Sequence, residues 1–241
     1  MKHTVLLAIL AAALLAPPAV RADEMTNHWR LDTSVNLFLA GLSGDAMVKG
    51  RPADVNVGFG DIAKNLEFAA AGRVTVGYDR WSLSTEVSYM GLGVSKGPVS
   101  ADLDQWLVEP SIGYRFCKYV EAFVGVRYNN ISGEVRFNGP LDRVPTGTQE
   151  WWDPIVGVNL SLPLVGQKLT FDGRFDVGGF GAGSDFTWQA YPHFNWRFAK
   201  WGSAQLGYRW LGTDYKNGSG ASEFRYDVIA QGPQLGLTFH F

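Results

Sequence analysis

Hydrophobic and polar residues alternate along most of the chain after residue 22, and the alternation is clearest in its final segment, Pro233-Gln-Leu-Gly-Leu-Thr-Phe-His-Phe241. Leu235, Leu237, Phe239 and Phe241 share one face there, because successive side chains of a strand point to opposite sides. Chain ends usually fray. An apolar strand that runs to Phe241 is therefore expected to be paired and to face an apolar environment.

The same period of two, read between turn signals, predicts an antiparallel up-and-down transmembrane β-barrel of about ten strands, with eight or twelve as alternatives. Short and long connections alternate along the chain, which is typical of a barrel with tight turns at one rim and loops at the other. The predicted strands are 29–42, 67–78, 81–93, 102–116, 119–137, 151–162, 168–178, 185–198, 201–215 and 224–241. The predicted long connections are 43–66, 94–101, 138–150, 179–184 and 216–223.

One face of each predicted strand is apolar and the other carries the charges, so the polar face is expected to point into the barrel. A soluble barrel or sandwich would place its charges outside. The near balance of acids and arginines predicts a paired charge network that fills a narrow lumen, since unpaired buried ions are costly and about ten strands enclose little space. The predicted network comprises Asp32, Arg73, Glu86, Glu109, Arg115, Glu121, Arg127, Asp153, Asp172, Arg174, Asp176, Arg197 and Arg209.

Aromatic residues gather in two bands along the predicted strands. Trp81, Tyr114 and Trp196 adjoin short turns, whereas Tyr89 and Trp188 lie near the long connections. At ~3.3 Å per residue and a tilt of about 40°, the bands are roughly 20–25 Å apart along the membrane normal, which matches the aromatic girdles of membrane barrels.

Residues 1–22 have the layout of a secretory signal peptide, with Lys2, an apolar run and a small-residue cleavage site after Ala22. An N-terminal membrane helix is the alternative. Residues 23–241 then form the barrel. The net charge of −2 gives no reason to expect nucleic acid as a partner, the single cysteine precludes an internal disulfide, and no motif predicts a metal or cofactor.

Four segments together carry a resemblance to known proteins: residues 54–68, 173–189, 207–215 and 232–241. Through them the chain resembles small Gram-negative outer-membrane β-barrel proteins of the porin-like kind. The resemblance spans nearly the whole chain after residue 22. It implies a location in the bacterial outer membrane, contact with membrane lipid and lipopolysaccharide, and no assigned catalytic residue. The last motif is similar to the signal read by the barrel-assembly machinery, and it places Leu235, Leu237, Phe239 and Phe241 in that signal.

The function expected from these features is a structural protein or a narrow passive pore for small solutes, and not an enzyme. The alternative is a membrane-embedded lipid- or peptide-modifying enzyme, which a Ser or Asp cluster converging with His193 would favour. Asp61, Ile62 and Leu66 in the longest connection are candidates for a short lid or plug, or for a helix packed on the rim. The run Gly178–Gly183 predicts a tight hairpin rather than a phosphate-binding loop. The oligomeric state stays open.

The apolar positions of the last strand change parity on the two sides of Gly232-Pro233. Leu235 to Phe241 are apolar at odd positions, whereas Phe224, Tyr226 and Val228 are apolar at even ones. Because proline lacks an amide donor, we predict a bulge at Gly232-Pro233 that resets the outward face.

Deletion of Phe241 is expected to impair barrel assembly more than solubility of the exported chain, because the deletion truncates the predicted assembly signal. Heat-modifiable mobility in electrophoresis measures the assembled fraction. A normal yield of the heat-modifiable form after the deletion would contradict this role.

Overall fold

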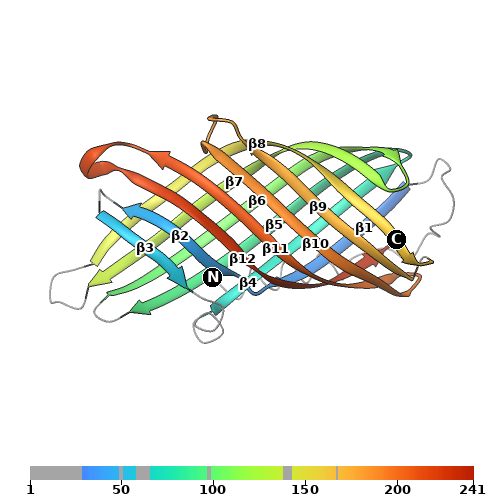
Figure 1. Cartoon of the computed structure of the whole chain (residues 1–241), viewed down its shortest axis with the longest axis horizontal. Helices are drawn as coiled ribbons and strands as arrows, with labels where there is room; N and C mark the ends of the chain where they lie inside the picture. The colour runs from blue at the N-terminus through green and yellow to red at the C-terminus, as the bar shows by residue number, and fades with distance from the viewer. Residues whose placement is uncertain (1–28, 49–50, 58–65, 97–98, 138–142, 167) are drawn as a thin grey trace.

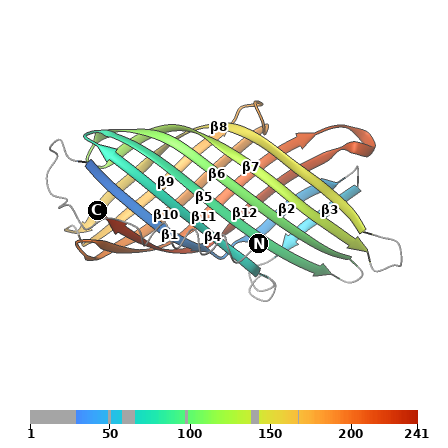
Figure 2. The ribbon, with the colours of Figure 1, turned by 180° about the vertical axis from the view of Figure 1, so that it is seen from behind.

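Ten strands wind antiparallel into a closed barrel in the computed structural model, which describes residues 29–48, 51–57, 66–96, 99–137, 143–166 and 168–241. Each strand pairs with the next along the chain, and β1 pairs with β12 to close the ring (Figures 1 and 2). The barrel strands are β1 (Trp29–Phe38), β4 (Leu66–Tyr78), β5 (Trp81–Lys96), β6 (Val99–Cys117), β7 (Val120–Phe137), β8 (Arg143–Val165), β9 (Leu169–Gly179), β10 (Phe186–Ala199), β11 (Gly202–Asn217) and β12 (Phe224–His240).

The prediction that residues 43–66 form a long connection without strands is wrong for much of this segment. β2 (Gly41–Val48) continues the course of β1 along β12, and β3 (Arg51–Val57) returns beside it as an additional strand. The first predicted strand therefore divides after Phe38. The physical reason is that β12 extends well past the end of β1, and its unpaired edge takes a new partner.

The two rims differ as the sequence predicted. At one rim, where β1 begins and β12 ends, short turns join neighbouring strands; this is called the short-turn rim. At the other, called the long-loop rim, the strands run further than predicted, since β6 begins at Val99 and β8 at Arg143. A single turn of 3₁₀ helix, Gly220–Ser222, lies between β11 and β12. Within the described ranges, no helix is long and apolar enough to cross a membrane.

The predicted bulge at Gly232-Pro233 is also wrong. β12 keeps one register with β11 across both residues, pairing Arg209 with Gly232 and Tyr208 with Pro233. The interruption lies instead in the neighbouring chain, between β1 and β2. A Cβ added to Gly232 would lie 1.9 Å from the carbonyl oxygen of Leu39, so glycine permits this close backbone approach.

The outward face of β12 is consequently not reset. Tyr226 and Val228 point inward and are buried, as Gln234 is further along the strand, whereas Leu235 and Leu237 on the other face are about half exposed. The change of parity therefore records a change inside the barrel, from a polar to an apolar lumen. The sequence of β12 alone did not distinguish this change of the lumen from a bulge.

The outer wall is apolar, with aromatic pairs near both rims. Trp81 packs edge-on against Tyr114 at 4.9 Å near the short-turn rim. Tyr128 and Trp152 are 4.7 Å apart towards the long-loop rim. The exposed side chains between them include Leu83, Ile112, Val124, Val156 and Leu206, so the surface matches the apolar band of a membrane barrel.

The glycine-rich run forms the predicted tight hairpin between β9 and β10. Gly179, Phe180 and Gly181 all have positive φ angles, of 85°, 52° and 75°, which glycine adopts without steric cost. This hairpin stops part-way along the barrel axis and does not reach the end of the barrel that the β11–β12 hairpin reaches (Figure 1).

Candidate functional site

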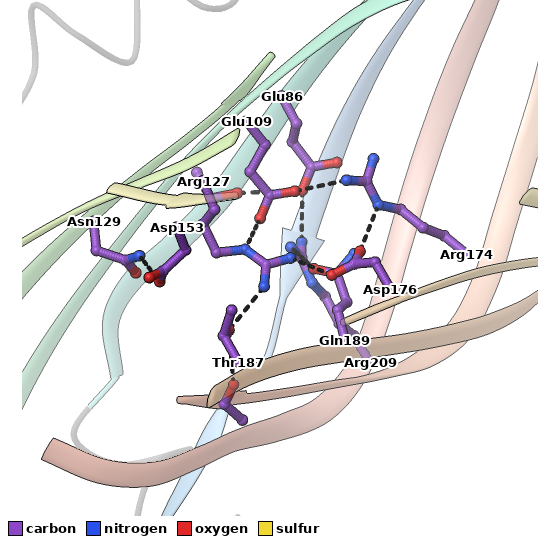
Figure 3. A network of polar contacts seen from close by, with 12 residues as sticks. Glu86, Glu109, Arg127, Asn129, Asp153, Arg174, Asp176, Thr187, Gln189 and Arg209 are labelled. Atoms are coloured by element: carbon purple, nitrogen blue, oxygen red, sulfur yellow. Dashed lines mark hydrogen bonds and ion pairs between the residues drawn. The ribbon is translucent and has the colours of Figure 1, made fainter. Parts of the chain in front are cut away.

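An ionic cluster of seven charged side chains lies in the middle of the lumen and is the most densely connected polar group of the described structure (Figure 3). Its members come from strands on opposite sides of the barrel, where period-two alternation points each of them inward. The central ionic cluster comprises Arg73, Glu86, Glu109, Arg127, Arg174, Asp176 and Arg209.

Two ion pairs cross the lumen. Glu86 on β5 accepts a hydrogen bond of 2.8 Å from Arg209 on β11, and Glu109 on β6 accepts one of 2.9 Å from Arg174 on β9. Arg73 adds a second partner to Glu86 at 2.7 Å. The Arg73 contact joins the adjacent strands β4 and β5. The two crossing pairs join strands that are not neighbours, so they occupy the cross-section of the barrel.

Arg127 is the most enclosed member of the cluster, with no exposed side-chain surface. Its guanidinium donates to Glu109 at 2.6 Å, to Asp176 at 2.8 Å and to Thr187 at 2.9 Å. Figure 3 shows it between the carboxylates of Glu109 and Asp176. A buried guanidinium needs such partners, because removing an ion from water is costly.

Asp153, which the sequence placed in the network, lies apart from the central ionic cluster. Its carboxylate accepts hydrogen bonds from Asn129 at 3.3 Å, from the indole of Trp151 at 2.9 Å and from the backbone amide of Ser184 at 2.7 Å. Its role is therefore to hold the low β9–β10 hairpin against the wall.

The remaining predicted charges lie near the short-turn rim. Asp32 pairs with Arg30 at 3.1 Å, and Arg115 with Glu121 at 3.6 Å. Asp172 accepts a hydrogen bond from Ser161 at 2.7 Å. These charged side chains are 15–31% exposed. In contrast, all members of the central ionic cluster except Arg73 are nearly buried. Arg197 forms no ion pair with any described residue.

Towards the long-loop rim the lumen is filled by apolar side chains, contrary to the expectation that the inward face is polar throughout. The outer apolar cluster includes a stacked pair, Trp151 and Tyr215, whose rings are 3.8 Å apart. Its other buried members are Phe38, Ala40, Leu42, Ala69, Met90, Leu107, Ile131, Leu211, Phe224, Tyr226, Val228 and Ala230. The inward parity of Phe224, Tyr226 and Val228 was the sequence signal for this cluster.

Two cavities flank the central ionic cluster. The one towards the outer apolar cluster measures about 20 Å³, room for about one water molecule. The one towards the short-turn rim, called the short-turn cavity, measures about 280 Å³ and is lined by polar residues. The lumen thus has space for solvent on one side of the ionic cluster and is packed on the other.

The histidines give one arrangement that sequence reasoning did not find. His240 lies between Ser203 and Asp32, with Oγ 3.1 Å from Nε2 and Nδ1 2.7 Å from the carboxylate. This order of contacts is that of a Ser-His-Asp triad, yet Ser203 has no exposed surface. His193, the residue singled out from the sequence, instead lies 4.0 Å from Asp172 and contacts the Tyr191 carbonyl at 3.2 Å.

The other predicted sites fall in different places. Phe241 exchanges backbone hydrogen bonds with Leu31, and Leu235, Leu237 and Phe239 lie in paired β12, so the segment named as an assembly signal is held on both sides. Leu66 is the first residue of β4. Asp61, Ile62 and the signal peptide 1–22 lie outside the described residues. Within the described part of the chain, no group of three potential ligands could hold a metal ion.

The fold defines a transmembrane-type antiparallel β-barrel, and comparison with solved structures agrees. The protease OmpT of Escherichia coli superposes with a TM-score of 0.52 at 10% identity, covering 92% of this chain and 99% of its own. Ail, the attachment invasion locus protein of Yersinia pestis, gives 0.42 at 9% identity, covering 89% and 99%. A major outer membrane protein of Thermus thermophilus gives 0.44 at 13%, covering 88% and 99%. No protein-family model and no curated protein matches the sequence.

At these identities the likeness establishes the fold alone. The chain has the fold of small outer-membrane β-barrel proteins, as the resemblance in its sequence predicted. The likeness does not assign the functions of those proteins to this chain. The evidence on function therefore comes from the residues of the lumen.

Replacing Arg127 with Met should lower the free energy of unfolding by about 3–5 kcal/mol, because Glu109 and Asp176 then lose a fully buried partner. Replacing Arg115 with Met is the matched control, with a loss below about 1 kcal/mol for its partly exposed, longer contact. Guanidinium unfolding of the refolded barrel in lipid vesicles, followed by tryptophan fluorescence, measures both. Equal losses in the two variants would show that burial of the cluster has no special weight.

Proposed function

We propose that this protein is an integral outer-membrane β-barrel whose lumen is closed, so that it acts as a structural protein with at most a narrow passive path for small solutes. The observation that carries the proposal is the pair of ionic bridges across the lumen, Glu86 to Arg209 and Glu109 to Arg174. The proposal places the short-turn rim in the periplasm, the usual side for tight turns.

The closure has two layers of different chemistry. Ions or polar solutes that pass the outer apolar cluster would lose hydration among Trp151, Tyr215 and their neighbours, which is costly without compensating hydrogen bonds. Beyond it they would meet guanidinium and carboxylate groups that are paired across the lumen. Each layer by itself narrows the route that a solute would take through the lumen. Because both layers lie across the same lumen, a solute would have to pass both.

The outer wall supports membrane insertion. Its exposed Leu, Val, Ile and aromatic side chains offer an apolar surface to lipid and lipopolysaccharide. The paired C-terminal strand fits recognition by the barrel-assembly machinery, which we propose as a transient partner.

In planar bilayers the refolded protein should show no stable open level, because both layers close the lumen. Combining Glu86→Ala and Arg209→Ala with Trp151→Ala and Tyr215→Ala removes one crossing pair and the stacked rings, and discrete openings should follow. The matched control is Trp152→Ala, the adjacent residue, whose side chain faces outward and is 56% exposed. A large, stable current through the unaltered protein would overturn the closed-lumen proposal.

The arrangement of Ser203, His240 and Asp32 supports a second candidate function, acyl hydrolysis at the short-turn rim. It requires Ser203, now fully covered, to become accessible to a substrate carbonyl. We expect it to stay covered, so a fluorophosphonate probe should not label the folded barrel. Labelling that disappears in a Ser203→Ala variant would favour the hydrolase over the structural protein.

A further inference from the structure

The short-turn cavity has an uneven distribution of charge that the closed-lumen proposal does not use. Of the central ionic cluster, three arginines, Arg73, Arg174 and Arg209, line this cavity, but only one carboxylate, Glu86, does so. Glu109 and Asp176 are not among its lining residues. The floor of the cavity therefore presents more guanidinium than carboxylate.

The two acids of the cavity wall, Asp32 and Asp172, make their contacts outside the central ionic cluster, and Asp172 lies 4.0 Å from the Nε2 atom of His193. Asp32 is held by Arg30 at 3.1 Å and by His240 at 2.7 Å. Asp172 accepts the hydroxyl of Ser161 at 2.7 Å. A guanidinium group has five N–H donors, and the Nε atom of Arg209 has no acceptor among the described residues.

Uncharged polar atoms around the cavity also lack partners. The carbonyl oxygens of the Asn36 and Gln234 side chains are buried and accept no hydrogen bond in the described structure. The side chain of Gln234 lies beside the hydroxyl of Tyr191 and interacts with it. A buried polar atom left without a partner is destabilising, and a hydrogen bond from water or from a ligand hydroxyl would remove that cost.

The dimensions suit a small molecule. About 280 Å³ corresponds to roughly nine water volumes at about 30 Å³ each, and it lies at the lower end of the range for ligand pockets. Tyr191 and His193, stacked with ring centroids 4.3 Å apart, give the wall a flat aromatic surface beside the polar groups.

We propose that the short-turn cavity binds a small hydroxylated organic carboxylate. The carboxylate lies against the guanidinium groups of Arg73, Arg174 and Arg209, where charge-assisted hydrogen bonds are strong. Hydroxyl groups of the ligand pair with Asn36, Gln234 and Tyr191. Because the ionic cluster closes the inner end of the cavity, a ligand enters from the short-turn rim. This step rests on the function proposed above, which places that rim in the periplasm.

The test uses the refolded full-length barrel in detergent micelles and two matched probes, D-glucuronate and D-glucose, in isothermal titration calorimetry. Glucuronate should bind saturably and at least tenfold more tightly than glucose, and its affinity should fall as salt is raised. Equal binding of the two sugars, or no binding of glucuronate, would overturn the proposal.

Variants of lining residues outside the ionic cluster locate the site. Gln234→Leu should weaken glucuronate binding at least tenfold, while Gln231→Leu, on the outward face of the same strand, should leave it unchanged. If Gln234→Leu does not fold, Asn36→Asp keeps the side-chain size and adds a repelling charge, and the same loss is expected. Unchanged affinity in the folded variant would contradict the site.

The proposed binding site and the proposed function can fail independently of each other. Bilayer conductance tests whether the lumen is closed, and calorimetry tests whether the cavity beneath the closure takes an anion. A closed barrel that binds neither sugar would leave the structural role intact and remove the binding site, whereas an open barrel that still binds glucuronate would do the reverse.

Discussion

The structure depends on closure of the sheet between its first and last strands. In an apolar medium each unpaired backbone amide or carbonyl costs several kcal/mol, so only a sheet without free edges is stable there. β1 meets that need by pairing with β12 from Asp32 opposite His240 to Phe38 opposite Gln234. Closing after ten strands fixes a narrow diameter, and side chains from opposite walls then come within hydrogen-bonding distance.

The narrow lumen is filled in two chemically different ways along its length. In the middle, arginines and carboxylates neutralise one another across the barrel; Arg127 is fully buried because Glu109 and Asp176 both reach it. Towards the long-loop rim, stacked Trp151 and Tyr215 and their neighbours exclude water by apolar packing. The ionic part gives directional contacts between particular strands, while the apolar part needs only complementary shape.

The two fillings meet at β12 and explain its sequence. One face of this strand is apolar near the chain end because it belongs to the exposed outer wall, and the other is apolar further up because it belongs to the outer apolar cluster. A single alternating strand can therefore show a change of parity without any bulge. Gly232 marks the level of the change, where the neighbouring chain approaches too closely for a side chain.

The sequence by itself determined which face of each strand is apolar, the alternation of turns and loops, and the set of inward charges, because these depend on period two and on local turn chemistry. Only the tertiary structure decided which charges meet. Arg127 and Asp176 are brought together, Asp153 is drawn to the Ser184 amide, and Arg197 has no ion pair among the residues that the structure describes, since pairing depends on strand tilt and on distance across the barrel. The apolar upper lumen and β2 were missed for the same reason, because their partners are remote in sequence. β3 pairs with β2 and so depends on it.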